Sequence, residues 1–190
     1  MRVIAGQWRG RRLPPPPSGT RPTPERAREA LFSMLYSRGL EGSQVRLLDL
    51  FCGSGAIGIE ALSRGAGTVG FVDRSRRALT QIERFVRNID ESRRFQTRAL
   101  DLPRQIPQLA ALRTEEPYNV IFCDPPFSAP LPPAVLLHDP VIDELFDANG
   151  LVIWEQQAHD DPEAYAQVPG WETVDERRYG RVRFWFYRRE

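Results

Sequence analysis

Residues 45–58 have the sequence VRLLDLFCGSGAIG, an apolar strand pattern that runs directly into a glycine-rich turn. A helical pattern follows at once, over residues 56–64. Gly53, Gly55 and Gly58 allow a tight turn and a close approach of the backbone to a ligand. A strand, a glycine-rich turn and a helix in this order are typical of an open α/β sheet, which binds ligands at the carboxyl ends of its strands.

The alternation of strands and helices continues along the chain. After the first strand, 45–50, strand patterns lie at 68–72, 95–100, 118–123 and 150–155. Helical patterns lie at 75–88, 103–112 and 134–146. Ser75 would cap the first of these helices, and Pro140 would interrupt the last. Two late β segments, 171–178 and 181–187, flank a turn at Tyr179-Gly180. This order predicts an α/β fold with a Rossmann-like, mainly parallel sheet, an antiparallel edge strand, and helices on both faces.

The first 40 residues have a different pattern, which predicts an N-terminal extension (1–40) to a main domain (41–190). Residues 2–13 predict a small β-hairpin whose tip carries Trp8 and several arginines. Such a tip could hold RNA through phosphate contacts and base stacking, or it could simply cover a sheet edge. A proline-rich linker and a helix follow, with Thr23 as N-cap, Pro24 at the first helical position and an end near Gly39.

Composition limits the classes of function. With 2 Cys in 190 residues no disulfide framework is expected, and a reduced, cytoplasmic setting is favoured. No apolar run is long enough to span a membrane, and the two histidines lack ligand-like spacing, so no metal is expected. The net charge of +1 hides basic ends, because residues 1–30 carry seven Arg against two Glu and residues 176–190 carry six Arg against two Glu. Segregated basic charge of this kind indicates a nucleic-acid partner.

Two cofactors fit the glycine-rich turn. Its Gly-x-Gly-x-x-Gly spacing, with Asp73 at the end of the next strand, matches the pattern of a dinucleotide-binding enzyme. However, Asp49 precedes the glycines, where it would repel a pyrophosphate and attract a cation. S-adenosylmethionine carries a sulfonium, an ammonium and a ribose but no phosphate, so it fits both acids. Asp101, at the end of the third strand, could reach the adenine.

A second distinctive stretch is Asp124-Pro125-Pro126-Phe127, which follows the buried strand pattern at 118–123. Consecutive prolines make a stiff, extended turn. It presents a carboxylate, a free carbonyl and a flat ring together, which suits a planar amine. The alternative is a proline-rich loop whose Asp caps a helix.

Taken together, these stretches resemble S-adenosylmethionine-dependent amino methyltransferases. More narrowly, the chain is similar to the bacterial RsmD family, which methylates the exocyclic N2 of a guanine in 16S ribosomal RNA. The residues that carry this resemblance are Met1–Gly6 with Trp8-Arg9-Gly10, Arg21-Pro22-Thr23 with Arg26, Arg28, Glu29 and Leu31-Phe32, Glu60–Ala66, and Tyr179-Gly180. Family members often have Glu where this chain has Asp73.

The resemblance implies a set of site residues. The catalytic loop would consist of Asp124, Pro125, Pro126 and Phe127. The cofactor would contact Asp49, Phe51, Gly53, Gly55, Asp73, Asp101 and Thr23. The RNA would contact Arg9, Arg11, Arg12, Arg21 and Arg26. The partner would be 16S ribosomal RNA in a small subunit or an assembly intermediate, bound by a monomer. An adenine-N6 methyltransferase on DNA or RNA, an NAD-dependent oxidoreductase and a non-catalytic ribosome-binding module are the alternatives.

Overall fold

The computed structural model describes residues 1–16, 23–90, 94–126, 131–158 and 162–190. Within these residues one sheet of seven strands has the order β3-β2-β1-β4-β5-β7-β6. The strands are β1 (Arg46–Leu50), β2 (Thr68–Asp73), β3 (Phe95–Ala99), β4 (Tyr118–Cys123), β5 (Phe146–Gln157), β6 (Trp171–Tyr179) and β7 (Val182–Arg189). β1 to β5 are parallel, and β7 lies antiparallel between β5 and β6. The predicted α/β class is confirmed, with two antiparallel strands at one edge.

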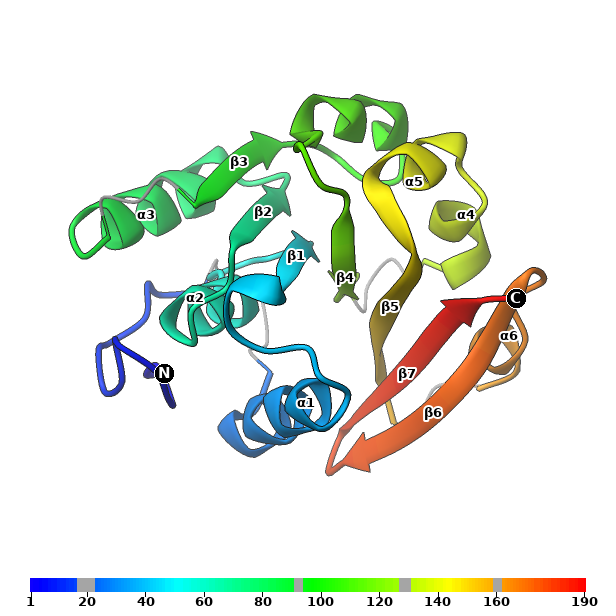
Figure 1. The fold of residues 1–190 in the computed structure, drawn as a ribbon, viewed down its shortest axis with the longest axis horizontal. Helices are drawn as coiled ribbons and strands as arrows, with labels where there is room; N and C mark the ends of the chain where they lie inside the picture. Colours follow the sequence, from blue (N-terminus) through cyan, green and yellow to red (C-terminus); the bar gives the residue numbers. More distant parts are fainter. Residues whose placement is uncertain (17–22, 91–93, 127–130, 159–161) are drawn as a thin grey trace.

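Helices cover both faces of the sheet (Figure 1). One face carries α1 (Glu25–Ser37), α2 (Ala56–Ser63) and α3 (Arg76–Arg87), and the other carries η2 (Ile106–Leu112), α4 (Pro133–Leu137) and α5 (Pro140–Leu145). Two short elements that the sequence patterns did not predict, η1 (Gly42–Gln44) and α6 (Glu163–Ala166), complete the described part. None of the described helices is long and apolar enough to cross a membrane.

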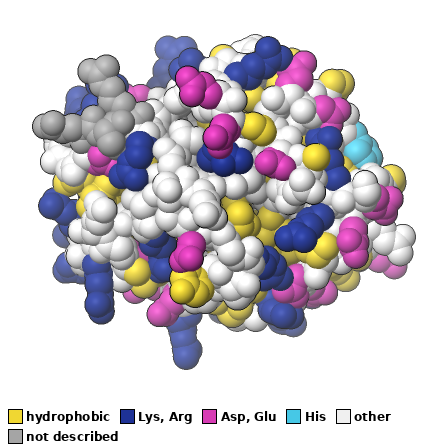
Figure 2. Space-filling model, in the orientation of Figure 1, with side chains coloured by type: hydrophobic (Ala, Val, Ile, Leu, Met, Phe, Trp, Pro, Cys, Tyr) yellow, Lys and Arg dark blue, Asp and Glu magenta, His cyan; other side chains and the backbone are white. Residues whose placement is uncertain are grey.

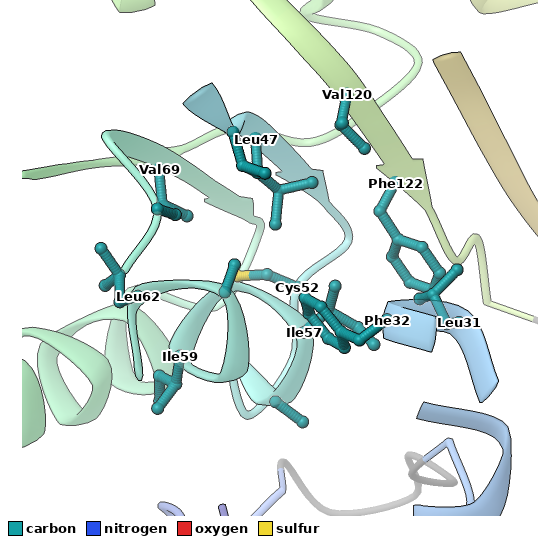
Figure 3. Close-up of a cluster of buried hydrophobic side chains, with 14 of the residues drawn as sticks. Leu31, Phe32, Leu47, Cys52, Ile57, Ile59, Leu62, Val69, Val120 and Phe122 are labelled. Carbon is teal, nitrogen blue, oxygen red and sulfur yellow. The ribbon is translucent and has the colours of Figure 1, made fainter. Parts of the chain in front are cut away.

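The strands bury side chains on both faces, as parallel strands between two helical layers must. Along β1, Leu47 points into the core beneath α1 and α2, whereas Leu48 points into the core on the α5 side. Figure 3 shows the first of these cores, where Ile57 of α2 and Leu31 of α1 meet Phe122 of β4. The carboxyl ends of β1, β2 and β4 are therefore held in fixed positions at one edge of the sheet.

The N-cap predicted for α3 is present in the structure, whereas the one predicted for α1 is not. Ser75 caps α3, because its Oγ accepts a hydrogen bond from the Ala78 N–H at 3.2 Å. The predicted Thr23 cap of α1 is wrong: Pro24 occupies that position without a side-chain cap, and the Thr23 hydroxyl donates to Glu155 Oε2 at 2.8 Å. A cap would use the Thr23 oxygen as an acceptor for a backbone N–H, but α1 begins one residue later than predicted, so the side chain faces Glu155 and donates to its carboxylate instead.

The N-terminal segment pairs with itself as predicted, with an antiparallel bridge between Arg2 and Arg12. Its aromatic residue behaves differently from the prediction. Trp8 is only 5% exposed and its backbone N–H donates to Ser63 Oγ, so the ring packs in the core and cannot stack on a base. Arg9 and Arg11 are exposed, like Arg12.

A buried carboxylate fastens this segment to α2. Glu60 is fully buried, and its two oxygens accept hydrogen bonds from the Ile4 N–H at 2.8 Å and the Ala5 N–H at 2.9 Å. Residues of α1 such as Leu31 belong to the same core as α2. The division of the chain at residue 40 stays a prediction.

Gly58 provides a test of the packing between α2 and the sheet. A Cβ at this position would lie 2.2 Å from Cε1 of the buried Phe71. Gly58→Ala should therefore destabilise the protein by about 1–3 kcal/mol, measured as the midpoint of urea denaturation. At Gly10 an added Cβ would meet nothing within 4 Å, although φ is +83°. Gly10→Ala should cost only about 1 kcal/mol from backbone strain, and an equal loss in both variants would contradict the packing argument.

Candidate active site

Four strands of the sheet end in acidic residues at the same edge. Asp49 lies near the end of β1, Asp73 ends β2, and Asp124 directly follows β4. Glu155 lies near the end of β5, and the pairing of Cys123 with Trp154 puts it beside Asp124 on the neighbouring strand. The parallel register thus brings together residues that are up to 106 positions apart in the chain.

The glycine-rich turn between β1 and α2 is held by Asp73. Asp73 Oδ2 accepts a hydrogen bond from the Gly53 N–H at 2.8 Å, and Oδ1 accepts one from the Ser75 N–H at 2.7 Å. Phe51, Gly53 and Gly55 have φ angles of 59°, 53° and 73°, so the turn uses the left-handed region three times within five residues. Each Asp73 oxygen has a second lone pair for a ribose hydroxyl. That contact, like those of Phe51, Gly53 and Gly55, stays a prediction.

Asp49 lies beneath the same turn. It is 1% exposed, and its Oδ2 accepts a hydrogen bond from the Gly58 N–H at 2.9 Å. The pKa of Asp49 is raised to about 8, chiefly by burial and to a smaller extent by the charge of Asp73, against the lowering effect of this hydrogen bond. This carboxylate therefore becomes more stable as an anion when a cation binds nearby.

The Asp124 loop is joined to the start of the glycine-rich turn. The Asp124 N–H donates to the carbonyl of Leu50 at 3.3 Å, which places the end of β4 beside the end of β1. Asp124 is partly exposed, Pro125 is buried and Pro126 is exposed. The pKa of Asp124 is raised well above its usual range by desolvation and by the charges of Glu155 and Asp49. Phe127 lies outside the described residues.

Glu155 is a site residue that the sequence patterns did not single out. It is 2% exposed, and burial raises its pKa to about 7 even though the Thr23 hydroxyl donates to it. The available signal was its position at the end of the apolar run 150–154, where Asp49 and Asp124 also follow apolar strands. Through Thr23 it joins the start of α1 to this edge of the sheet.

The remaining predicted residues lie at the periphery. Asp101 is exposed, with its carboxylate 4.0 Å from Arg104, and its contact with adenine stays a prediction. Arg26 is exposed on the first turn of α1, and Arg21 lies outside the described residues. In the described part of the chain, no group of three His, Cys, Asp or Glu side chains could hold a metal ion.

The electrostatics of the edge fit S-adenosylmethionine better than a dinucleotide. The charges that act on Asp49 and on Asp124 are those of other carboxylates, and each raises the pKa of its neighbour. A pyrophosphate would add further negative charge, whereas a sulfonium and an ammonium would neutralise these groups. Asp49, Asp73 and the glycine-rich turn are the residues that would hold such a cation.

A Rossmann-like sheet with this carboxylate edge defines the class of S-adenosylmethionine-dependent methyltransferases. The model of the family described as "Conserved hypothetical protein 95" matches residues 1–188, and the chain belongs to this RsmD-like family. It is 33% identical to "Ribosomal RNA small subunit methyltransferase D" of Escherichia coli K12, covering 100% of this chain and 90% of that protein. The methyltransferase of the same name from Haemophilus influenzae is 36% identical over 67% of this chain and 64% of its own length.

Solved structures agree with this assignment. The Escherichia coli yhhF structure has a TM-score of 0.77 and 30% identity, covering 100% of this chain and 98% of that one. A hypothetical protein of Thermus thermophilus has a TM-score of 0.74 and 28% identity, covering 98% of each chain. The predicted enzyme class and cofactor are confirmed, which leaves the oxidoreductase and the non-catalytic module without support.

The pKa of Asp49 predicts how stability depends on pH. Because its pKa is raised from 3.8 to about 8, the folded state holds a proton that the unfolded state has lost between these values. The contribution of Asp49 to stability therefore falls as pH rises from about 4 to 8. Asp49→Asn, which keeps an oxygen for the Gly58 N–H, should be more stable than the parent protein by at least about 1 kcal/mol at pH 8 and similar to it at pH 4.5.

Thermal melts from pH 4.5 to 8 measure this difference. Added S-adenosylmethionine should stabilise the parent protein more at pH 8 than at pH 6, because a bound cation favours the ionised carboxylate. This increase should be smaller in Asp49→Asn. A variant with the same pH dependence as the parent would show that Asp49 is already ionised in the folded protein.

Proposed function

We propose that this protein transfers a methyl group to the exocyclic N2 amine of a guanine in 16S ribosomal RNA. The observation that carries the proposal is the position of Asp124, a partly exposed carboxylate of raised pKa whose N–H is bonded to the end of β1, where the cofactor turn begins. The relatives named as small-subunit ribosomal RNA methyltransferases support RNA as the substrate.

The chemistry requires a poor nucleophile to be held in one orientation. The lone pair of a guanine amine is delocalised into the ring. The Asp124 carboxylate and the Pro125 carbonyl would each accept one N–H of this amine, which directs the lone pair out of the ring plane. S-adenosylmethionine supplies a methyl group on a positively charged sulfur and leaves as S-adenosylhomocysteine. Most of the acceleration then comes from positioning and electrostatics.

The proton released by the amine needs an acceptor. Solvent water could serve, but the raised pKa of Asp124 makes its carboxylate a better base than an ordinary aspartate. The Pro125–Pro126 sequence keeps the adjoining backbone extended, so the carboxylate and the carbonyl hold a fixed relation. A base inside a duplex could not reach this loop, so the target guanine must be unpaired or flipped out.

The arginines of the N-terminal segment would hold the RNA backbone. In the view of Figure 2 basic side chains project at the lower left, over the N-terminal segment and α1. Arg9, Arg11 and Arg12 of the N-terminal segment are exposed, and Arg26 on the first turn of α1 would extend the same contact. Arg21, also predicted to contact the RNA, lies outside the described residues. The proposal includes a monomer that acts in the cytoplasm on a small subunit or an assembly intermediate. Thr23, predicted as a cofactor contact, would cover the methionine end from α1.

Asp124→Ala is the principal test. It removes the amine acceptor and the base while leaving the glycine-rich turn intact, so turnover should fall by about 10³-fold. The affinity for S-adenosylhomocysteine should stay within a few-fold, measured by calorimetry. The substrate is the RNA or small subunit from a strain that lacks the gene, and mass mapping identifies the modified nucleotide. Glu172→Ala, an exposed acid on β6, is the control, and undiminished turnover by Asp124→Ala would refute the mechanism.

A second test concerns the arginines. Replacing Arg9, Arg11 and Arg12 by Gln should weaken RNA binding and reduce the slope of log K against log salt by about 2–3. Arg98, Arg104 and Arg113 are exposed arginines whose neighbours pack on the opposite face of the sheet. Their triple replacement makes the same change in net charge and should leave the slope nearly unaltered. Equal effects of the two triple variants would indicate general electrostatics rather than a binding face.

A further inference from the structure

A cavity of about 410 Å³ opens beside Glu155. It lies between the first turn of α1, the end of β5 and the turn that joins β6 to β7. Its volume is within the range of about 300–1,000 Å³ that is typical of small-molecule sites. Figure 1 shows this turn close to α1, so two segments far apart in the sequence enclose the cavity. Nothing in the cofactor site described above accounts for it.

The lining combines three kinds of surface. Ala27 and Val182 are buried apolar residues, and Tyr179 is half-buried with its ring 5.9 Å from that of Phe184. Glu155 is the carboxylate among the lining residues. Arg178 and Arg181, with Arg26 of α1, add basic charge. Apolar walls, one carboxylate and a basic rim together match a planar base that donates an N–H and is attached to a phosphate backbone.

The basic rim gives a role to the charge at the C-terminal end of the chain. Residues 176–190 carry six Arg against two Glu. Arg178 and Arg181 flank the β6–β7 turn and are exposed, whereas Gly180 at its centre has a φ of +60° that allows the reversal. The turn therefore holds two guanidinium groups at the mouth of the cavity. Neither has a carboxylate partner among the ion pairs of the described residues.

We propose that this cavity receives the target base and that Glu155 selects guanine by accepting a hydrogen bond from its ring N1–H. This inference rests on the proposed function and adds its specificity-determining residue. Asp124 does not line the cavity itself, but it follows Cys123, whose pairing with Trp154 puts Asp124 beside Glu155 on adjacent parallel strands about 4.8 Å apart. Two carboxylates at this spacing can face two neighbouring N–H groups of one base edge, the amine at Asp124 and the ring N–H at Glu155.

The two purines differ at this position. Guanine places an N1–H donor next to its amine, whereas adenine places an N1 lone pair next to its amine. A carboxylate accepts from the first and repels the second. The Thr23 hydroxyl donates to Glu155 Oε2 and fixes the direction of the side chain, and it is the one donor to the Glu155 carboxylate among the side-chain hydrogen bonds of the described residues. An acceptor held in this way discriminates against a base that offers no proton.

The test changes the base in the RNA and the Glu155 side chain in the protein. 2-Aminopurine keeps the exocyclic 2-amine but has a lone pair at N1 and lacks O6, so the role of N1 is measured by the change in preference that Glu155→Gln causes. It is placed at the nucleotide that the parent protein methylates, in the same naked or assembled substrate. The parent protein should prefer guanine to 2-aminopurine by at least about 100-fold in kcat/KM. Glu155→Gln can turn its amide N–H toward N1, so this preference should shrink at least about tenfold.

The outcomes separate the inference from the proposed function. If the parent protein methylates no guanine, the proposed function fails before any variant is compared. If Glu155→Gln slows guanine and 2-aminopurine equally, Glu155 is a structural residue and the inference is overturned. Glu155→Asp retains a carboxylate and should keep the preference for guanine at a lower rate. Should Glu155→Gln melt below the assay temperature, loss of the preference in Glu155→Asp would equally overturn the inference.

The rim of the cavity is tested separately. Arg178→Gln with Arg181→Gln should raise KM several-fold and reduce the salt slope of RNA binding by up to about 2. The preference for guanine over 2-aminopurine should stay unchanged, because neither arginine faces N1 in this arrangement. Glu172→Gln, outside the cavity, is the control for both measurements. An unaltered KM and salt slope would remove the turn from the RNA-binding surface and overturn this part of the inference.

Discussion

The burial of carboxylates at one edge of the sheet is the constraint on which the local structure depends. The pKa values of Asp49, Asp124 and Glu155 are all raised, chiefly because burial penalises their charged forms. Such groups would destabilise the fold if nothing compensated them. The N–H of Gly58, in the first turn of α2, compensates Asp49, the N–H of Gly53 in the glycine-rich turn bonds Asp73, and the Thr23 hydroxyl compensates Glu155. The turn and the start of α1 thus take their positions partly from these acids.

Buried charged groups with backbone hydrogen-bond partners also hold the N-terminal segment in place. Glu60 is fully buried in α2, yet it accepts the N–H groups of Ile4 and Ala5 and pairs with Arg64. Arg28 of α1 is also fully buried, and its guanidinium donates to the carbonyl of Arg2 at 2.9 Å. Burial lowers the pKa of Arg28, and the negative charge of Glu60 partly offsets this lowering. Removing Glu60 would take away the largest opposite charge that offsets the burial of Arg28 and would be destabilising for that reason. The arginines of the N-terminal segment therefore project from a backbone that is fixed to α1 and α2.

Periodicity was enough to predict most of the fold, since β1, β2, β4 and β5 contain apolar runs and α1 and α3 have an apolar stripe, whereas the pattern of β3 is weaker. The Ser75 cap was predictable because its hydrogen bond is local, to Ala78. Thr23 and Trp8 were not, because their partners, Glu155 and Ser63, are 132 and 55 residues away. The position of β7 between β5 and β6 likewise depends on long-range pairing, which no local pattern encodes.

Some residues of the candidate site could likewise be predicted from the sequence, and one could not. Asp49, Gly53, Asp73 and Asp124 belong to recognisable motifs at strand ends, so their common edge followed from the predicted parallel sheet. Glu155 belongs to no motif, and its significance appears only when the strand order puts β5 next to β4.

This division has a chemical consequence for specificity. An acid followed by two prolines can orient any planar amine, so the loop after β4 does not by itself distinguish guanine from adenine. Discrimination needs a second group that faces the ring nitrogen beside the amine, and in a parallel sheet the adjacent strand end is the nearest rigid position for it. In this protein that position holds a buried carboxylate, which is complementary to the protonated N1 of guanine and repels the bare N1 of adenine. The loop would then determine which kind of group reacts, and its neighbouring strand would determine which base carries it.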